Sequence, residues 1–295
     1  MSELSTLILP AAPSLGSLYA TAAAGKLRGL LPGSKPAART VPQVEHRLES
    51  LPINRQKLVD YQRLMGDTVR DELPSVFVHG IVFPLAMSVL VRDDFPLPLL
   101  GMVHLSNAVT HLAPIAPSAV LTAVAHAENL RGHRAGTQVD LLVEVSAGTE
   151  LVWRSVSTYL ARGVFLGERP SEEARPHQEF THPTRTASWR LGAATGREYA
   201  AVLGDYNPIH LSAPSAKVLG MKSAIAHGMY LAGRALAGAA PHGTGYAWEI
   251  SFATPVFLPS TVDIAITSAL DKTEFSGWGS RSGKPHFSGT VTPLA

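Results

Sequence analysis

Three landmarks occur twice in this chain, in the same order, and this repetition limits the possible folds more than any other feature. They are Tyr61-x4-Gly66-Asp67 and Tyr199-x4-Gly204-Asp205, His79-Gly80 and His227-Gly228, and Pro117-Ser118 and Pro259-Ser260. The copies stand 138, 148 and 142 residues apart, respectively. The repetition predicts two copies of one folding unit. The wider second spacing indicates that the first copy lacks about ten residues, where the second copy has Asn207-Pro208-Ile209-His210.

Each copy has the hydrophobic pattern of helices followed by strands. In the first copy we expect a strand over 44–48, helices over 55–65 (capped by Asn54) and 79–91, and strands over 101–112, 119–128, 137–146 and 150–161. In the second we expect a strand over 186–191, helices over 196–203 (capped by Thr195) and 228–239, and strands over 248–254, 261–270 and 286–292. Helices combined with rows of antiparallel strands give an α+β fold.

The composition shifts along the chain predict four regions. Residues 1–40, rich in Ala, Gly, Ser and Pro, form an N-terminal extension with a short helix over about 18–30 that ends at Pro32-Gly33. Whether this extension is packed or loose stays open. Residues 41–166 and 185–295 form two domains, and the charged, proline-containing stretch 167–184 links them. With 295 residues, 45% of them hydrophobic, the chain is long enough for two cores.

The composition also excludes several classes of function. The net charge of +2 is small and scattered, which argues against a nucleic-acid partner. The absence of cysteine excludes disulfides, thiolate metal sites and a cysteine nucleophile, and it fits a reducing compartment. Glu3 stands where a secretory signal has a basic residue, and Pro10 interrupts the first apolar run. We therefore expect a cytoplasmic protein without membrane insertion.

The second copy carries the residues that point to chemistry. Asp205 and His210 stand five residues apart, and Pro208 between them predicts a rigid, non-helical loop. A carboxylate and an imidazole held in this way are suited to general acid–base catalysis. An apolar helix is expected to begin at Gly228. Because the first amides of a helix have no acceptor inside it, they can stabilise an oxyanion.

These motifs resemble a known signature. Gly204-Asp205-x-Asn207-Pro208-Ile209-His210 followed by Ile225-Ala226-His227-Gly228-Met229 is similar to the pattern of the MaoC-like, or type 2 (R)-specific enoyl-CoA hydratase, family. The resemblance implies a double hot-dog fold, in which two curved antiparallel sheets are each wrapped around a central helix. It also implies a degenerate N-terminal copy beside a catalytic C-terminal one. By this resemblance Asp205 and His210 are the catalytic pair and Gly228 is the oxyanion donor.

Asn207 and His227 complete the candidate site. An Asn side chain caps nearby backbone amides, so Asn207 is expected to shape the loop. His227 either orients the start of the helix or contacts the substrate, and the presence of His79 in the first copy favours the structural role. Which member of the catalytic pair is the base stays open, because two such groups share their protonation states. Two positions depart from the family pattern, Leu203 and Ser212. We expect them to adjust the surroundings of the catalytic pair more than the reaction itself.

The remaining signals predict no further site. His104 with His111, and His126 with His133, lack a third ligand at suitable spacing, so no metal is expected. The stretch 192–196 lacks the second glycine of a dinucleotide-binding loop. No Gly-x-Ser-x-Gly occurs, which argues against a serine hydrolase. No cofactor is expected.

Together the motifs and the resemblance predict a (3R)-hydroxyacyl-thioester dehydratase of fatty acid metabolism, acting in reverse as an (R)-specific enoyl-thioester hydratase. Its substrate is expected on coenzyme A or on acyl carrier protein. Two alternatives are a hot-dog acyl-CoA thioesterase, which releases a free thiol, and a non-catalytic subunit that only binds an acyl thioester. The internal duplication is compatible with a monomeric pseudo-dimer and with a homodimer.

Overall fold

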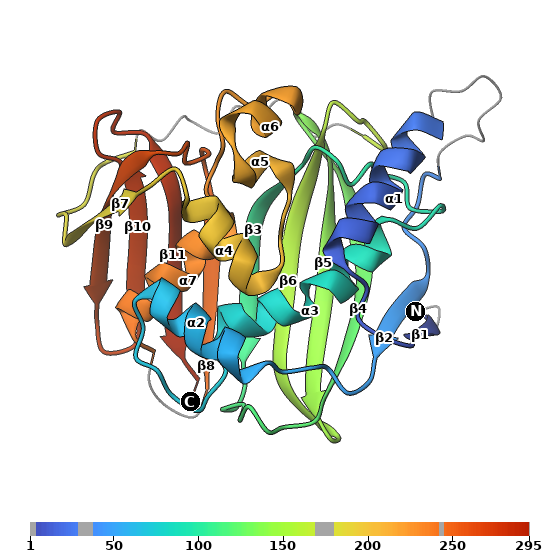
Figure 1. Ribbon diagram of the computed structural model, residues 1–295, viewed down its shortest axis with the longest axis horizontal. Helices are drawn as coiled ribbons and strands as arrows, with labels where there is room; N and C mark the ends of the chain where they lie inside the picture. Colours follow the sequence, from blue (N-terminus) through green and yellow to red (C-terminus); the bar gives the residue numbers. More distant parts are fainter. Residues whose placement is uncertain (1–3, 29–37, 169–179, 242–244, 295) are drawn as a thin grey trace. The chain divides into compact units, whose positions relative to one another are not determined.

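The computed structural model describes residues 4–28, 38–168, 180–241 and 245–294 (Figure 1). Contacts within the chain divide it into two compact units. The first unit comprises Met1–Ile53, Val78–Leu105 and Ser118–Ser171, and the second comprises Asn54–Phe77, Ser106–Pro117 and Glu172–Ala295. Because this division is not contiguous in sequence, the domain boundaries expected at 40, 166 and 184 stay a prediction.

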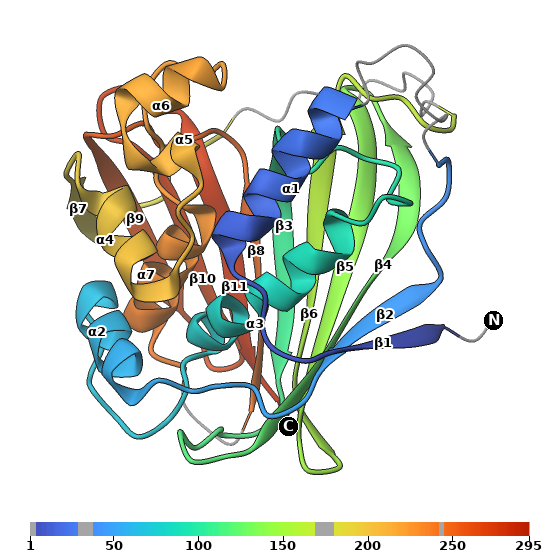
Figure 2. The same ribbon diagram turned by 45° about the vertical axis from the view of Figure 1, so that its right-hand side comes forward.

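The first unit is a mostly antiparallel sheet with one apolar helix against it. Its elements are β1 (Ser5–Leu9), α1 (Leu15–Arg28), β2 (Val44–Leu48), most of α3 (Ser75–Leu90), β4 (Leu121–His133), β5 (Gly136–Ala147) and β6 (Glu150–Arg162). The strand order is β1-β2-β4-β5-β6, with β1 parallel to β2 and the other pairs antiparallel. Figure 2 shows α3 crossing the face of β4 to β6, and the His79 ring of α3 meets Trp153 of β6.

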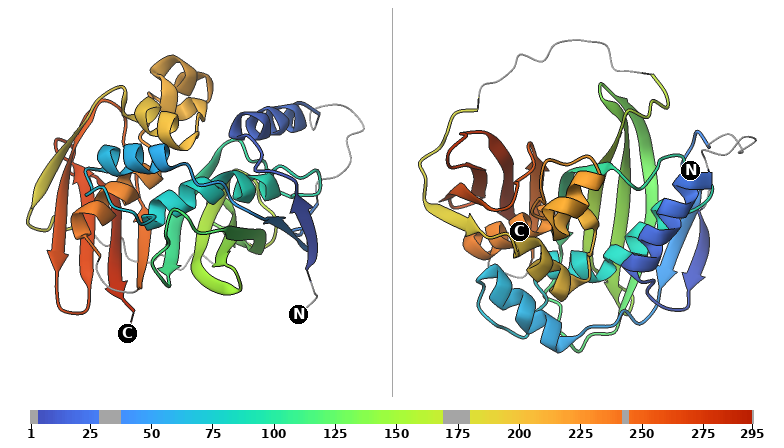
Figure 3. Two further views of the ribbon diagram at one scale, coloured as in Figure 1. Left: turned by 60° about the horizontal axis from the view of Figure 1, so that its bottom comes forward. Right: turned by 45° about the horizontal axis from the view of Figure 1, so that its top comes forward.

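The second unit has the same plan, a sheet with a central helix, and adds several short helices. Its elements are α2 (Arg55–Met65), the second part of β3 (Met102–His111), β7 (Ala187–Leu191), α4 (Thr195–Leu203), α5 (Pro208–Leu211), α6 (Ala213–Val218), α7 (Gly228–Ala239), β8 (Tyr246–Phe252), β9 (Ser260–Ser268), β10 (Thr273–Gly279) and β11 (Pro285–Pro293). The strand order is β3-β8-β11-β10-β9-β7, all antiparallel. In the left view of Figure 3, these strands lie below the helices of the same unit.

Small residues let helix α7 pack closely on two sides. A Cβ atom added at Gly238 would come within 2.7 Å of the Ile266 side chain in β9. A Cβ atom added at Gly233 would come within 2.5 Å of the Tyr61 hydroxyl in α2. At such distances an added methyl group would require the Ile266 side chain, or the Tyr61 and Met65 side chains, to shift. The glycines therefore serve packing against a second helix as well as against the sheet.

Most elements expected from the sequence are present, with three corrections. Helix α3 begins at Ser75 instead of residue 79. Its early start is supported by Trp248, whose indole N–H donates a 2.8 Å hydrogen bond to the Ser75 hydroxyl. Thr195 is not the cap of α4, because Ala194 occupies that position and makes no side-chain hydrogen bond. Four elements were not expected: β1, β10, α5 and α6.

Two expectations fall partly outside the described residues. The predicted end of the first helix at Pro32-Gly33 lies within 29–37, and most of the predicted linker lies within 169–179. Among the helices that the structure does describe, none combines the length and the apolar character needed to cross a membrane.

Candidate active site

Asp205 follows directly on the end of helix α4. Gly204 terminates that helix in the left-handed conformation, with φ of 84°, and its N–H bonds to the Ala200 carbonyl. Glycine is favoured at this position because it has no Cβ to clash. The Asp205 carboxylate accepts a 3.3 Å hydrogen bond from the backbone N–H of Asn207. The turn after α4 thus holds the carboxylate at a defined place in the second unit.

The segment between Asp205 and His210 contains one helical turn, so the expectation of an entirely non-helical loop was wrong. Helix α5 starts at Pro208, and Asn207 caps it by accepting a 3.3 Å bond from the Ile209 N–H. Proline is well suited to the first helical position, because its fixed φ fits the helix and its missing N–H is not needed there. The cap agrees with the expected loop-shaping role of Asn207.

His210 is a buried, neutral imidazole with a defined tautomer. Its Nδ1 lies 2.9 Å from the Ile225 carbonyl oxygen. Because a carbonyl can only accept, Nδ1 carries the hydrogen and Nε2 is left as the basic atom of the neutral ring. The pKa of His210 is lowered from 6.5 to about 3, first by burial and then by His227, against the opposing effects of Asp205 and of the bond to Ile225.

His227 contacts both members of the expected catalytic pair. Its ring stacks on His210, with centroids 3.6 Å apart, and its Nε2 donates a 3.0 Å hydrogen bond to the Asp205 backbone carbonyl. The same nitrogen lies 3.6 Å from the Asp205 carboxylate. Burial lowers the pKa of His227 from 6.5 to about 4, while the bond to Asp205 opposes this shift. These contacts support the positioning role over direct contact with substrate.

Helix α7 begins at Gly228, as predicted, and places two backbone amides at the site. His227 precedes the helix in an extended conformation, and its carbonyl accepts from the N–H groups of Tyr230 and Leu231. The amides of Gly228 and Met229 come before these, so they have no acceptor within the helix. A Cβ atom added at Gly228 would lie 2.9 Å from the Phe252 ring. The absence of a side chain therefore lets this helix end sit against β8.

The corresponding place in the first copy is built differently. Helix α3 begins at Ser75, so Gly80 is its sixth residue. In an α-helix the amide at that position bonds to the carbonyl four residues earlier. Asp67, the counterpart of Asp205, pairs instead with Arg70 at 2.6 Å. Neither the helix-end amide nor the acid–base pair is therefore reproduced in the first copy.

Two further residues support the site and were not identified from the sequence. A Cβ atom added at Gly196 in α4 would lie 2.0 Å from the His210 carbonyl oxygen, so α4 packs directly on the His210 backbone. The Tyr199 ring lies 4.7 Å from the His227 ring. Burial, with a smaller contribution from Asp205, raises the pKa of Tyr199 well above its ordinary value. The repeated Tyr landmark was the available signal for Tyr199, and no signal in the sequence marked Gly196.

The same three side chains could hold a metal ion. Asp205, His210 and His227 each offer a ligand atom, and these atoms lie within 4.8 Å of one another. His210 and His227 each donate one ring N–H to a backbone carbonyl, which leaves one unprotonated nitrogen per ring. The expectation of a metal-free site stays a prediction.

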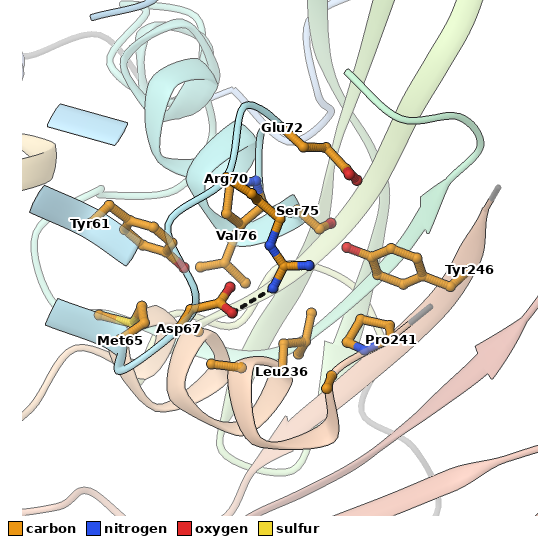
Figure 4. Close-up of a pocket in the computed structure, with 14 residues that line it drawn as sticks. Tyr61, Met65, Asp67, Arg70, Glu72, Ser75, Val76, Leu236, Pro241 and Tyr246 are labelled. Carbon is orange, nitrogen blue, oxygen red and sulfur yellow. Dashed lines mark hydrogen bonds and ion pairs between the residues drawn. The ribbon is translucent and has the colours of Figure 1, made fainter. Parts of the chain in front are cut away.

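A separate pocket in the second unit is lined by Tyr61 and Asp67, two of the repeated residues of the first copy. It is bordered by residues of α2 and α7 and of the segments that follow them, and Figure 4 shows Tyr61, Asp67, Arg70, Leu236 and Tyr246 around it. The dashed line in that view is the Asp67–Arg70 ion pair. None of the residues that line it belongs to the Asp205–His210 motif. The pocket is thus distinct from the candidate active site.

Comparisons with known proteins agree with the motif and the fold. A family model described as a MaoC like domain matches residues 171–276. The chain is 32% identical to 3-hydroxyacyl-thioester dehydratase X of Mycobacterium tuberculosis over 278 residues, which is 91% of this chain and 98% of that protein.

Solved structures are similar as well. The crystal structure of HtdX from Mycobacterium tuberculosis matches with a TM-score of 0.75 and 31% identity, covering 85% of this chain and 100% of that one. A MaoC-like dehydratase from Phytophthora capsici matches at 0.63 and 18% identity, with coverage of 85% and 95%, which shows the shared fold alone. The predicted α+β double hot-dog fold is confirmed. With its match to the family model and 32% identity to a relative over nearly its whole length, the chain belongs to the family of proteins with a MaoC-like domain.

Proposed function

We propose that the protein is a (3R)-hydroxyacyl-thioester dehydratase, which in reverse hydrates trans-2-enoyl thioesters. The observation that carries this proposal is the convergence of three groups in the second unit. They are the Asp205 carboxylate and the neutral His210 ring, whose ligand atoms lie within 4.8 Å of each other, and the first amides of α7, which directly follow His227 where it stacks on His210. A dehydratase requires a base, an acid and a donor for the thioester oxygen, and these groups match the three roles.

In the hydration direction, a water molecule held by Asp205 and His210 supplies both groups that add to the double bond. Nε2 of His210 takes a proton from this water while the hydroxyl bonds to C3 of the substrate. The acid–base pair then returns a proton to C2, so that one water is added and the enzyme is restored. Dehydration follows the same steps in reverse. The low pKa of His210 leaves Nε2 unprotonated at neutral pH.

Negative charge develops on the thioester oxygen as the C2 proton is exchanged, and the amide of Gly228 is the proposed donor to it. The helix end adds a partial positive charge at the same point. Removing a single donor of this kind typically costs about 100- to 1,000-fold in kcat. We propose one such site per chain, because Gly80 lies inside α3 and Asp67 is paired with Arg70.

The test uses crotonyl-CoA and follows loss of the enoyl absorbance. Asp205→Asn and His210→Ala should each lower kcat by at least about 100-fold without unfolding the protein. Asp67→Asn is the matched control, since it changes the equivalent carboxylate of the first copy, and it should retain wild-type kcat. Full activity in either motif variant would contradict the assignment.

A thiol assay and a binding measurement, run beside the absorbance assay, separate the two alternatives. Release of free thiol from crotonyl-CoA, without hydration, would indicate a thioesterase. Tight binding of crotonyl-CoA without turnover would indicate a non-catalytic subunit. The choice of carrier, between coenzyme A and acyl carrier protein, and the expected cytoplasmic location belong to this proposal. Either a monomeric pseudo-dimer or a homodimer is compatible with a site built within the second unit.

A further inference from the structure

The segment after Asp205 is uniformly non-acidic. From Tyr206 to Trp248 the chain has no acidic residue, and its charged residues other than His are Lys217, Lys222 and Arg234. The guanidinium of Arg234 lies 4.6 Å from the centre of the Trp189 ring, so this charge makes a cation–π contact within the protein. Lys217 and Lys222 are exposed, and neither makes an ion pair within the described part of the chain. Two positive charges are therefore available to a partner.

Exposed apolar side chains stand between the two lysines. Val218 is 86% exposed and Leu219 45% exposed. The turn that presents them is closed by two 3.0 Å backbone hydrogen bonds, from the N–H groups of Gly220 and Met221. A single exposed valine is ordinary on a protein surface. An apolar pair that is held in a defined turn and flanked by lysines is suited to contact with another protein. We call residues 217–222 the lysine tip.

The lysine tip borders the candidate active site. Lys222 stands three residues before Ile225, whose carbonyl accepts the hydrogen bond from His210. Three residues span at most about 10 Å of chain, so the two features are close. Helix α6 is tied to α5 by the Ser215 hydroxyl, which donates a 2.7 Å bond to the Pro208 carbonyl. The left view of Figure 3 shows this part of the chain standing away from the strands.

We propose that the lysine tip docks an acidic acyl carrier protein that presents the thioester to Asp205 and His210, an inference that rests on the proposed function. The positive charge would steer an acidic partner toward the site. The phosphates of coenzyme A could also meet the lysines, but a nucleotide would leave Val218 and Leu219 in water. A protein partner covers such an apolar centre and meets the charges at the rim. The apolar pair therefore favours a carrier protein.

The experiment offers the same crotonyl chain on two carriers, acyl carrier protein and coenzyme A. The variant is the double substitution Lys217→Glu and Lys222→Glu. We expect kcat/KM for the carrier-protein substrate to fall about tenfold or more, with the value for crotonyl-CoA unchanged. Rising salt should lower the wild-type value for the carrier-protein substrate more steeply than that of the variant. The double substitution Lys57→Glu and Lys284→Glu, at two exposed lysines outside the tip, is the charge-matched control and should leave both values unchanged.

A second substitution tests the apolar part of the lysine tip. Val218→Asp should lower kcat/KM only for the carrier-protein substrate, because this exposed side chain has no role in the fold. Equal losses on both carriers would overturn the proposal and indicate a phosphate site for the nucleotide. Unchanged use of the carrier protein by the double variant would overturn it as well.

Direct binding separates this proposal from the proposed function. Binding of crotonyl-loaded acyl carrier protein to Asp205→Asn should be weakened by the double lysine substitution. Lysine-dependent binding with no hydration by the wild-type protein would refute the dehydratase and retain the docking surface. Hydration by the wild-type protein with no lysine-dependent binding would refute the docking surface and retain the dehydratase.

Discussion

The imidazole rings of His210 and His227 lie face to face, with centroids 3.6 Å apart and planes 26° from parallel. Each ring donates one N–H to a backbone carbonyl, His210 to Ile225 and His227 to Asp205. Since both rings are buried, a positive charge on either one is opposed by desolvation. Both are therefore neutral at neutral pH, and each ring keeps one unprotonated nitrogen.

The first prediction concerns the pH dependence of activity. The pKa of His210 is lowered to about 3, so this ring does not gain a proton between about pH 8 and about pH 5. We expect kcat/KM for crotonyl-CoA to show no acid limb centred near pH 6.5. A pH profile recorded with circular dichroism as a check on folding tests this expectation. A fall in kcat/KM with its midpoint near 6.5, in folded protein, would contradict a buried neutral His210.

The second prediction concerns stability against acid. The pKa values of His210 and His79 are lowered to about 3, and that of His227 to about 4, while the unfolded chain has values near 6.5. Below pH 6.5 the unfolded state therefore binds protons that the folded state does not. The contribution of these histidines to the free energy of unfolding is fully present above this pH. It is lost as the pH falls toward 4 for His227 and toward 3 for His79 and His210, by at most about 1.4 kcal/mol per pH unit for each histidine.

Urea unfolding at a series of pH values measures this slope. His79 stacks with Phe83 and faces Trp153 in the first unit, so His79→Leu removes one titrating group in an apolar setting. This variant should show a shallower loss of unfolding free energy on acidification than wild type. An unfolding free energy that is constant from pH 7 to pH 5 would argue against buried, neutral histidines.

The third prediction concerns His227 as a positioning residue. His227→Asn removes the ring that stacks on His210, and it disturbs the bond to the Asp205 carbonyl. A displacement of about 1 Å in a catalytic group can cost about 100-fold in rate. We expect kcat to fall by about 10- to 100-fold with little change in KM, because substrate contacts are retained. A large rise in KM with unchanged kcat would instead place His227 in contact with substrate.

The fourth prediction concerns the close approach of α4 to His210. Gly196→Ala places a methyl group 2.0 Å from the His210 carbonyl oxygen, so the helix or the histidine must move. We expect a loss of about 1–3 kcal/mol in unfolding free energy, together with a fall in kcat. Gly192→Ala is the matched control, because the nearest atom to its added Cβ is 4.0 Å away. Wild-type kcat and stability in Gly196→Ala would show that α4 does not position His210.

Much of the fold could be predicted because local patterns carry it. Asn54 does cap α2, by accepting from the Lys57 N–H at 3.0 Å, and α7 does begin at Gly228. Strands β4 and β5 follow apolar stretches bounded by turns. The family signature is also local, since Asp205 and His210 lie within six consecutive residues. Hydrophobic period, capping chemistry and short motifs are read from neighbours in the chain, so the sequence alone determines them.

The tertiary structure decided the features that depend on distant partners. The hydrogen bond from Trp248 to Ser75, the first residue of α3, joins residues 173 positions apart in the chain. The approach of Gly196 to His210 arises from the packing of α4 on α5. The stacking of His227 on His210, and the choice of Ile225 and Asp205 as carbonyl partners, set which ring nitrogen carries the proton. A sequence specifies which groups can donate or accept, whereas burial and the partner supplied by folding decide which protonation state is populated.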